Sequence, residues 1–228
     1  MKKVSIIIPV YNEARTIDLI IPKVLAAHIS GWTKEVIVID DGSTDGTADK
    51  LGRWKRQCRI FFERPNRGKG AAVTVGLKHA TGDVILIQDA DLEYDPADYP
   101  KLLSPFDNAH VNVVYGSRFL GPHLSTMLVY ELGNKFVTLM TNILFNTNIT
   151  DMETGYKAFR RSVLGGLLPL RAKRFDLEPE LSAKFLKLGL QIYEVPISYF
   201  GRKFSEGKKL TWRDGVIALW TLLWLRFF

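Results

Sequence analysis

Three carboxylates stand at alternate positions directly after an apolar run in the first half of the chain. The run is residues 84–88, and the carboxylates are Asp89, Asp91 and Glu93. Alternate residues of an extended chain point to the same side, so the three are predicted to share one face. Grouped carboxylates are costly unless a cation neutralises them, and oxygen ligands suit Mg²⁺ or Mn²⁺. The segment predicts a metal site shared with a substrate phosphate; the alternative is an acidic turn before a helix that starts at Asp95.

Two earlier strand-like segments, residues 4–10 and 35–39, also end in polar side chains. The side chains at these ends are Tyr11, Glu13, Asp40 and Asp41. Ligands of open α/β sheets bind beyond the carboxyl ends of strands, where neighbouring ends can converge on one crevice. An aromatic ring can stack on a base, and carboxylates can accept hydrogen bonds from a base or a ribose. The layout predicts a nucleotide-diphosphate site, and the absence of glycine fingerprints argues against a dinucleotide oxidoreductase or a P-loop ATPase.

Apolar periodicity predicts an α/β fold with a mostly parallel central sheet flanked by helices. In the first half, strands are expected at residues 4–10, 35–39, 59–63 and 84–88, and helices at 14–27, 44–57 and 68–80. In the second half, strands are expected at 111–116, 157–159 and 191–196, and helices at 133–145 and 180–188. Strands that alternate with helices imply right-handed crossovers between parallel neighbours.

Composition limits the function classes. The chain has 228 residues and is 46% apolar, which is ample for one sizeable domain. Its one cysteine, Cys58, excludes an intrachain disulfide, and no signal-peptide pattern precedes the first strand. The net charge of +7 favours an anionic partner. Nucleic acid is not expected, because no helix-turn-helix, zinc-finger or RNA-binding signature is present.

A membrane surface fits the charge better, because a basic stretch at residues 202–213 precedes an apolar run at 216–225. A spanning helix needs about 20 apolar residues, so no spanning helix is expected here. Tryptophans beside basic residues predict a helix that lies in a membrane interface. We therefore divide the chain into a domain of residues 1–211 and an amphipathic membrane-associating helix of residues 212–228. A core-packing helix, an oligomer helix or a chain that continues into membrane spans fits the same pattern, and residues 132–145 are a second interfacial candidate.

Further motifs stand along the chain in a fixed order. They are VSIIIPVYNE (4–13), VIDDGSTDGT (38–47), NRGKG (66–70), the Asp-Ala-Asp at 89–91, GSRF (116–119), DMETGYKAFR (151–160) and EVPI (194–197). In this order and spacing they resemble the family-2 inverting glycosyltransferases of the GT-A fold. The last three narrow the resemblance to the polyprenyl-phosphate sugar synthases, the group of the dolichol-phosphate mannose synthases. The resemblance covers about residues 3–215.

The resemblance implies roles at the donor side for matching positions. The base and ribose would be held by Pro9, Tyr11, Glu13 and Asp41, with Asp40 nearby. The metal and the donor pyrophosphate would be surrounded by Asp89, Ala90, Asp91 and Glu93. Arg202 and Lys208 would reach the phosphates from a loop that closes the site. Residues 66–70 read as a cationic turn that could hold a phosphate, or as a tight turn before a packed helix.

On the acceptor side, the resemblance implies that Arg118 faces the acceptor phosphate. Some relatives carry an arginine shortly before the Gly-Asn matched here by residues 133–134, and Lys135 could substitute for it. A phosphate monoester has a second pKa of about 6 and needs positioning more than deprotonation. Asp151 is still the best candidate for a base or for orienting the acceptor, with Glu153 weaker; the alternative for Asp151 is a helix cap or turn residue.

We therefore expect a metal-dependent inverting transferase that uses Mg²⁺ or Mn²⁺, with catalytic roles for Asp89, Asp91, Asp151 and Arg118. It would move a hexose from a nucleotide sugar to a polyprenyl phosphate at the cytoplasmic face of a membrane, as a peripheral protein. GDP-mannose is the first expectation for the donor and UDP-glucose the second. The alternatives are a family-2 transferase that acts on a glycan hydroxyl and a non-catalytic nucleotide-binding subunit. A membrane-anchoring partner or a homo-oligomer fits any of these.

Overall fold

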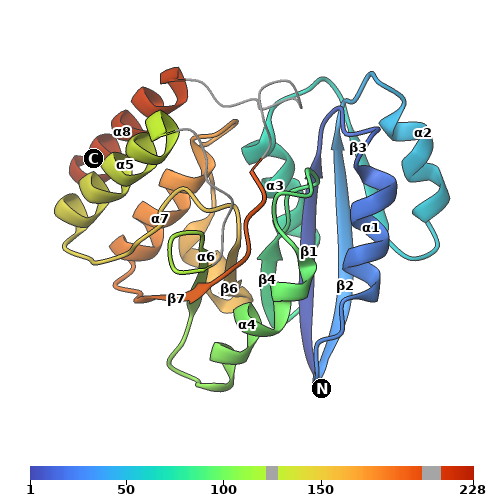
Figure 1. Ribbon diagram of the computed structural model, residues 1–228, viewed down its shortest axis with the longest axis horizontal. Coiled ribbons are helices and arrows are strands. Elements are labelled where there is room, and N and C mark those ends of the chain that lie inside the picture. The colour runs from blue at the N-terminus through green and yellow to red at the C-terminus, as the bar shows by residue number, and fades with distance from the viewer. Residues whose placement is uncertain (122–127, 202–211) are drawn as a thin grey trace.

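The computed structural model describes residues 1–121, 128–201 and 212–228. Within them, a seven-stranded sheet has the order β3-β2-β1-β4-β6-β5-β7 (Figure 1). The strands are β1 (Lys2–Val10), β2 (Trp32–Asp41), β3 (Arg59–Glu63), β4 (Val84–Ile87), β5 (Val113–Ser117), β6 (Lys157–Arg160) and β7 (Ile192–Pro196). The helices are α1 (Ile17–Ala26), α2 (Thr47–Leu51), α3 (Lys69–His79), α4 (Tyr99–Leu103), α5 (Leu128–Phe145), α6 (Leu164–Leu167), α7 (Leu177–Lys187) and α8 (Trp212–Phe227). Short 3₁₀ turns are η1 (Gly52–Trp54), η2 (Pro96–Asp98), η3 (Ser104–Asp107) and η4 (Arg161–Val163).

The sheet is mostly parallel, as the sequence predicts. β1 lies between β2 and β4 and runs parallel to both, β2 runs parallel to β3, and β5 runs parallel to β7. The exception is β6, which runs antiparallel to both β4 and β5. The parallel strands end at the same edge of the sheet, so the polar residues that follow β1, β2 and β4 come together there.

Two apolar layers cover the two faces of the sheet. On β1, Ile6 and Ile8 pack into one buried cluster with α1 and α4, whereas Ile7 packs into the other with α3 and α7. Because both faces are covered, the central strands read as continuous apolar runs and not as an alternation of apolar and polar residues.

The helix expected over residues 44–57 is shorter in the structure. It begins only at Thr47, after Gly46 with a φ of 88°, and gives way to η1 after five residues. Asp45 Oδ1 accepts the N–H of Thr47 at 3.1 Å, and such a side-chain-to-backbone bond competes with the helical pattern. The helices expected from residues 133 and 180 begin earlier, at Leu128 and Leu177.

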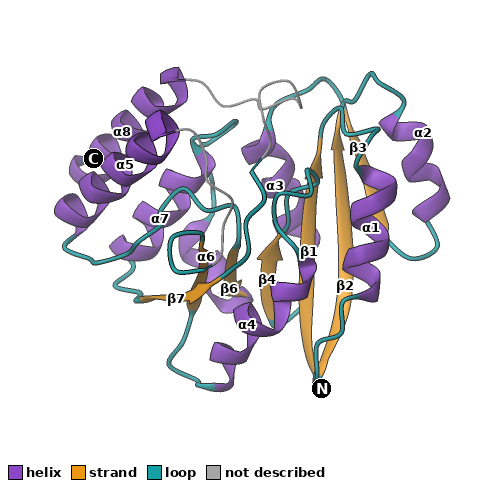
Figure 2. Cartoon of the chain, in the orientation of Figure 1, coloured by secondary structure: helices purple, strands orange, loops and turns teal. Residues whose placement is uncertain are grey.

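The C-terminal helix α8 packs on α5 and α7 at one end of the molecule (Figure 2). One face is buried, because Ala218, Leu222 and Leu225 belong to the second apolar cluster. The other face carries exposed apolar side chains, among them Ile217 and Trp220. One face of α8 thus packs in the core, and the other face offers apolar side chains to a partner or a membrane. None of the described helices has the length and apolar character to cross a membrane.

Gly76 allows α3 to approach the sheet closely. A Cβ at this position would lie 2.5 Å from Ile7 Cγ2 and 2.9 Å from Ile39 Cδ1. We expect Gly76→Ala to lower the free energy of unfolding by about 1–3 kcal/mol in urea denaturation, as overpacking does. Gly52→Ala is the matched control, because a Cβ there meets nothing within 4 Å and φ is −50°. Equal effects of the two substitutions would show that packing against β1 and β2 is not the cause.

Candidate functional site

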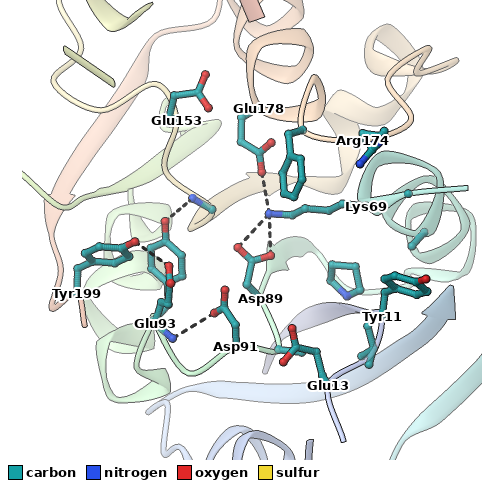
Figure 3. Close-up of a pocket in the computed structure, with 18 of the residues that line it drawn as sticks. Tyr11, Glu13, Lys69, Asp89, Asp91, Glu93, Glu153, Arg174, Glu178 and Tyr199 are labelled. Carbon is teal, nitrogen blue, oxygen red and sulfur yellow. Dashed lines mark hydrogen bonds and ion pairs between the residues drawn. The ribbon is translucent and has the colours of Figure 1, made fainter. Parts of the chain in front are cut away.

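A cavity of about 540 Å³ opens at the carboxyl ends of β1, β2 and β4 (Figure 3). The predicted donor-side residues that line it are Pro9, Tyr11, Glu13, Asp41, Asp89, Ala90, Asp91 and Glu93. The predicted acceptor-side residue Arg118 lines it as well. Segments more than a hundred residues apart in the sequence, such as those of Pro9 and Arg118, thus meet in one cavity.

Asp41 and Asp40, at the end of β2, have different surroundings. Asp41 lines the cavity and accepts the N–H groups of Arg67, at 3.0 Å, and Gly68, at 2.6 Å. Burial raises the pKa of Asp41 above its ordinary value, although these N–H groups act in the opposite direction. Asp40 is only 2% exposed and does not line the cavity, and its Oδ1 accepts no hydrogen bond from the residues that the structure describes. The structure therefore places Asp41, but not Asp40, where a ligand could be reached.

The glycine-rich turn before α3 uses its backbone donors within the protein. The N–H groups of Arg67 and Gly68 go to Asp41, and that of Gly70 goes to the carbonyl of Lys173 at 3.0 Å. A phosphate cradle would need these donors to point at the ligand. The tight-turn interpretation of residues 66–70 is therefore the one that matches the backbone.

Lys69, in the same turn, joins two carboxylates. Its Nζ lies 2.7 Å from Oδ1 of Asp89 and 2.8 Å from Oε1 of Glu178, at the start of α7. Burial alone would lower the pKa of Lys69, but the two carboxylates outweigh burial and hold that pKa above its ordinary value. This pairing was not predicted from the sequence, which marked only Lys69, within the turn of residues 66–70.

The three carboxylates after β4 do not follow an extended strand. β4 ends at Ile87, and Leu92 has a φ of 67°, so the chain turns between them. The predicted extended conformation of residues 89–93 is therefore wrong, although Asp89, Asp91 and Glu93 all line the cavity. No group of three or more His, Cys, Asp or Glu side chains within residues 1–121, 128–201 and 212–228 is arranged to hold a metal ion.

Each of these carboxylates has a contact of its own. Asp89 is paired with Lys69, Oδ1 of Asp91 accepts the N–H of Glu93 at 3.1 Å, and Oε2 of Glu93 accepts the hydroxyl of Tyr199 at 2.7 Å. A carboxylate has several lone pairs, so one such bond leaves acceptor capacity. Mg²⁺ is commonly held by one or two carboxylates together with substrate phosphates. Asp91 and Glu93 fit that mode, whereas the charge of Asp89 is balanced by Lys69.

Arg118 and Asp151 form a bidentate ion pair. The guanidinium Nε and one terminal nitrogen of Arg118 each lie 2.7 Å from a different oxygen of Asp151, and the backbone N–H of Arg118 also donates to Oδ2. The Asp151 side chain is 0% exposed and does not line the cavity, while that of Arg118 is 11% exposed and does. The structure thus gives Asp151 the task of orienting Arg118, and its burial disagrees with a base that touches substrate.

Lys135, the predicted substitute cation on the acceptor side, is not at the cavity wall. Lys135 is exposed, pairs with Glu131 at 2.6 Å and is absent from the lining, whereas Glu131 and Asn134 of the same helix line it. The expectation that Lys135 replaces an arginine of the relatives is therefore not supported. Arg202 and Lys208 lie outside the described residues.

Glu153 lines the cavity in a turn that a buried lysine fixes. Lys157 Nζ donates to the carbonyls of Met152, at 2.7 Å, and Thr154, at 2.6 Å. Burial, together with the nearby charge of Glu178, raises the pKa of Glu153 to about 7. Oε1 of Glu153 is buried and accepts no hydrogen bond from the described part of the chain.

The Arg118–Asp151 pair predicts a stability effect. Asp151→Ala leaves a buried guanidinium without its carboxylate, so we expect the free energy of unfolding to fall by about 3–5 kcal/mol in urea denaturation. Adding Arg118→Leu should restore part of this loss, because the unpaired charge is then gone. If the double variant is no more stable than Asp151→Ala, the loss does not come from the unpaired charge.

Comparison with known proteins agrees with the fold. Two curated relatives are the undecaprenyl-phosphate 4-deoxy-4-formamido-L-arabinose transferases of Salmonella paratyphi A and Salmonella dublin, each 29% identical over 216 residues. The matches cover 91% of this chain and 63% of each relative, so the chain spans less than two thirds of their length.

Solved structures show the same fold. Glucosyl-3-phosphoglycerate synthase from Mycobacterium tuberculosis in complex with UDP matches with a TM-score of 0.75 and 23% identity, over 99% of this chain and 80% of that one. The complex of that enzyme with Mn²⁺, UDP-glucose and phosphoglyceric acid gives the same values. The expected GT-A architecture is thereby confirmed. Residues 5–168, more than half of the sequence, match the family described as glycosyl transferase family 2, and the chain belongs to that family.

Proposed function

We propose that this protein is a metal-dependent inverting glycosyltransferase that moves a hexose from a nucleotide sugar to a polyprenyl phosphate. The observation that carries the proposal is the meeting of Tyr11, Asp41, Asp91, Glu93 and Arg118 in one cavity. The family membership and the relatives that act on undecaprenyl phosphate support it.

The donor would lie along the carboxyl ends of the strands. Tyr11 can stack on a base, and Glu13 and Asp41 can accept hydrogen bonds from the base or the ribose. Asp91 and Glu93 would hold Mg²⁺ or Mn²⁺, and such a metal stabilises the charge that develops on a leaving diphosphate. The neighbouring synthase was crystallised with Mg²⁺ and UDP, as well as with Mn²⁺, which supports a divalent metal here.

The acceptor would be a phosphate that Arg118 positions. In an inverting transfer, an oxygen of the acceptor phosphate forms a bond to the anomeric carbon as the bond to the diphosphate breaks on the opposite face. A phosphate monoester is largely dianionic at neutral pH, with a second pKa of about 6, so it can attack without a base. An attack without a base agrees with the role of Asp151, because both of its carboxylate oxygens are bonded to Arg118.

The lipid part of the acceptor fits the apolar surface beside the cavity. α5 and α8 pack together, and each has exposed apolar side chains. On α5 they are Leu128, Val129, Leu132, Phe136, Leu139 and Ile143, and on α8 they include Val216, Ile217, Trp220 and Phe227. Glu131 and Asn134 of α5 line the cavity. We propose that this apolar surface rests on the cytoplasmic face of a membrane, from which a lipid phosphate would reach Arg118.

A transfer assay tests the reaction. The full chain is incubated with Mg²⁺ or Mn²⁺, a short polyprenyl phosphate and a panel of labelled GDP- and UDP-sugars that includes GDP-mannose and UDP-glucose. We expect lipid-extractable label from one donor. Binding of nucleotide sugars without labelled lipid would contradict the acceptor and favour a glycan hydroxyl.

Asp91→Ala tests the metal site in the same assay. We expect the rate of transfer to fall by about 100-fold or more, the loss typical of removing a transition-state charge stabiliser, with no recovery in excess Mn²⁺. Asp107→Ala is the control, because Asp107 is an exposed carboxylate paired with Lys2 and does not line the cavity. Full activity of Asp91→Ala would contradict the proposed metal role, whereas a lack of transfer by the unmodified protein would favour a non-catalytic subunit.

The exposed face of α8 predicts membrane binding. Deleting residues 212–228 would expose the core, because Ala218 and Leu222 are buried. Substitutions on the exposed face of α8 therefore test membrane binding more specifically than the deletion does. Ile217 and Trp220 are 47% and 68% exposed. We expect Ile217→Ser with Trp220→Ser to weaken binding to phosphatidylglycerol vesicles about tenfold or more, from the lost burial of two apolar side chains, with nucleotide affinity unchanged.

The matched control for membrane binding is Leu19→Ser. Leu19 is 55% exposed on α1, at the opposite end of the molecule from α8 (Figure 1). If both variants bind vesicles as the unmodified protein does, the interfacial role of α8 is wrong.

A further inference from the structure

The inner part of the cavity holds a second group of ionisable side chains. Figure 3 shows Glu178 and Glu153 on the side of Asp89 opposite Glu13, with Lys69 beside them. The nucleotide-binding residues lie at the other side of Asp89, and the acceptor cation is Arg118. In a nucleotide sugar the sugar follows the diphosphate, so it would extend from Asp91 toward this inner part.

Lys69 and Glu178 form the fixed wall of this inner part. Nζ of Lys69 is held between Glu178, at 2.8 Å, and both oxygens of Asp89. Glu178 is a buried residue of α7 and Lys69 begins α3, so their ion pair is anchored on two helices. Fixed, charged hydrogen-bonding groups of this kind suit the recognition of sugar hydroxyls, which donate and accept.

Glu153 differs from its neighbours in having a buried oxygen without a partner. Its Oε1 accepts no hydrogen bond from the described residues, while Lys157 fixes the carbonyls on either side of it. A buried polar atom that makes no hydrogen bond destabilises the free protein. Glu153 lines the cavity, so a ligand hydroxyl could bond to its carboxylate after a small rotation of the side chain, and the free energy gained would appear as ligand affinity.

We infer that Glu153 hydrogen-bonds a hydroxyl of the transferred sugar and makes the site select neutral sugars over sugar acids. This inference rests on the proposed function. Of these four side chains three are carboxylates, and the single ammonium group, that of Lys69, already pairs with Asp89 and Glu178. The carboxylate of a sugar acid would therefore meet like charge beside Glu153. The same repulsion argues against contact between Glu153 and the acceptor phosphate.

The charge state of Glu153 agrees with this assignment. Burial and the charge of Glu178 raise its pKa to about 7, while Lys157 and Arg118 lower it and Asp151 raises it. The protonated form can donate to a hydroxyl and the ionised form can accept from one. A hydroxyl can therefore satisfy Glu153 in either state, whereas an anionic group can be accommodated only by the protonated form.

The experiment compares two affinities in the full-length protein. Calorimetry measures binding of the nucleoside diphosphate and of the nucleotide sugar that the transfer assay selects. We expect Glu153→Ala to weaken binding of the nucleotide sugar about tenfold, which is the loss typical of one hydrogen bond to a charged group. Binding of the nucleoside diphosphate should weaken less than about twofold.

Glu153→Gln is the matched variant, with the same shape and no charge. We expect Glu153→Gln to bind the neutral nucleotide sugar within a few-fold of the affinity of the unmodified protein. We expect the ratio of this affinity to the affinity for the corresponding nucleotide uronate to fall about tenfold. If Glu153→Ala does not fold, this change of preference alone decides the question.

Three outcomes would overturn the inference. Equal losses for nucleoside diphosphate and nucleotide sugar would mean that Glu153 only supports the fold of the cavity. Unchanged nucleotide-sugar affinity with a raised KM for the lipid phosphate would place Glu153 at the acceptor. An unmodified protein that binds neither nucleotide would overturn the proposed function as well, so the two failures are distinguishable.

Discussion

The ion pairs of Lys69 hold the cavity together. Lys69 begins α3, Asp89 follows β4 and Glu178 begins α7, so one ammonium group joins three elements from both halves of the chain. The Lys69 side chain is only 16% exposed, so replacing Lys69 would leave the carboxylates of Asp89 and Glu178 facing each other without the ammonium group between them. Asp89 is consequently fixed in position before any ligand arrives, and Asp91 follows it into the cavity at a set place.

Backbone contacts extend the same arrangement to the neighbouring segments. The carbonyl of Lys173 accepts the N–H of Gly70, and a Cβ on Gly70 would collide with that loop. The same loop carries Arg171, whose guanidinium lies 4.5 Å from the ring of Trp224 in α8. Thus α8 contacts the segment that packs on the start of α3, and Phe175 in that segment lines the cavity. The apolar helix and the polar site therefore share one supporting loop.

The strands and their polar ends could be predicted from the sequence. Strands buried between two helical layers are apolar along their whole length, and such a run can be recognised from a short stretch of sequence. The sequence did not predict the pairing of Lys69 with Glu178, which are 109 residues apart, or of Arg118 with Asp151. Such contacts depend on which strands become neighbours, and the reversed direction of β6 has no local signal. Leu92 has a left-handed backbone that turns the chain where an extended strand was predicted.

The two faces of α5 bear on which acceptor fits. Glu131 and Asn134 line the cavity, while Leu132, Phe136 and Leu139 on the same helix are exposed and apolar. A soluble glycan would use only the polar side and would leave the apolar surface in water, which is unfavourable for a surface of that extent. A phosphate on a lipid chain suits both the polar and the apolar side of α5, because its head group can pair with Arg118 while its chain stays in the membrane. The proposal of a lipid phosphate acceptor thus rests on the juxtaposition of a guanidinium and an apolar helix face.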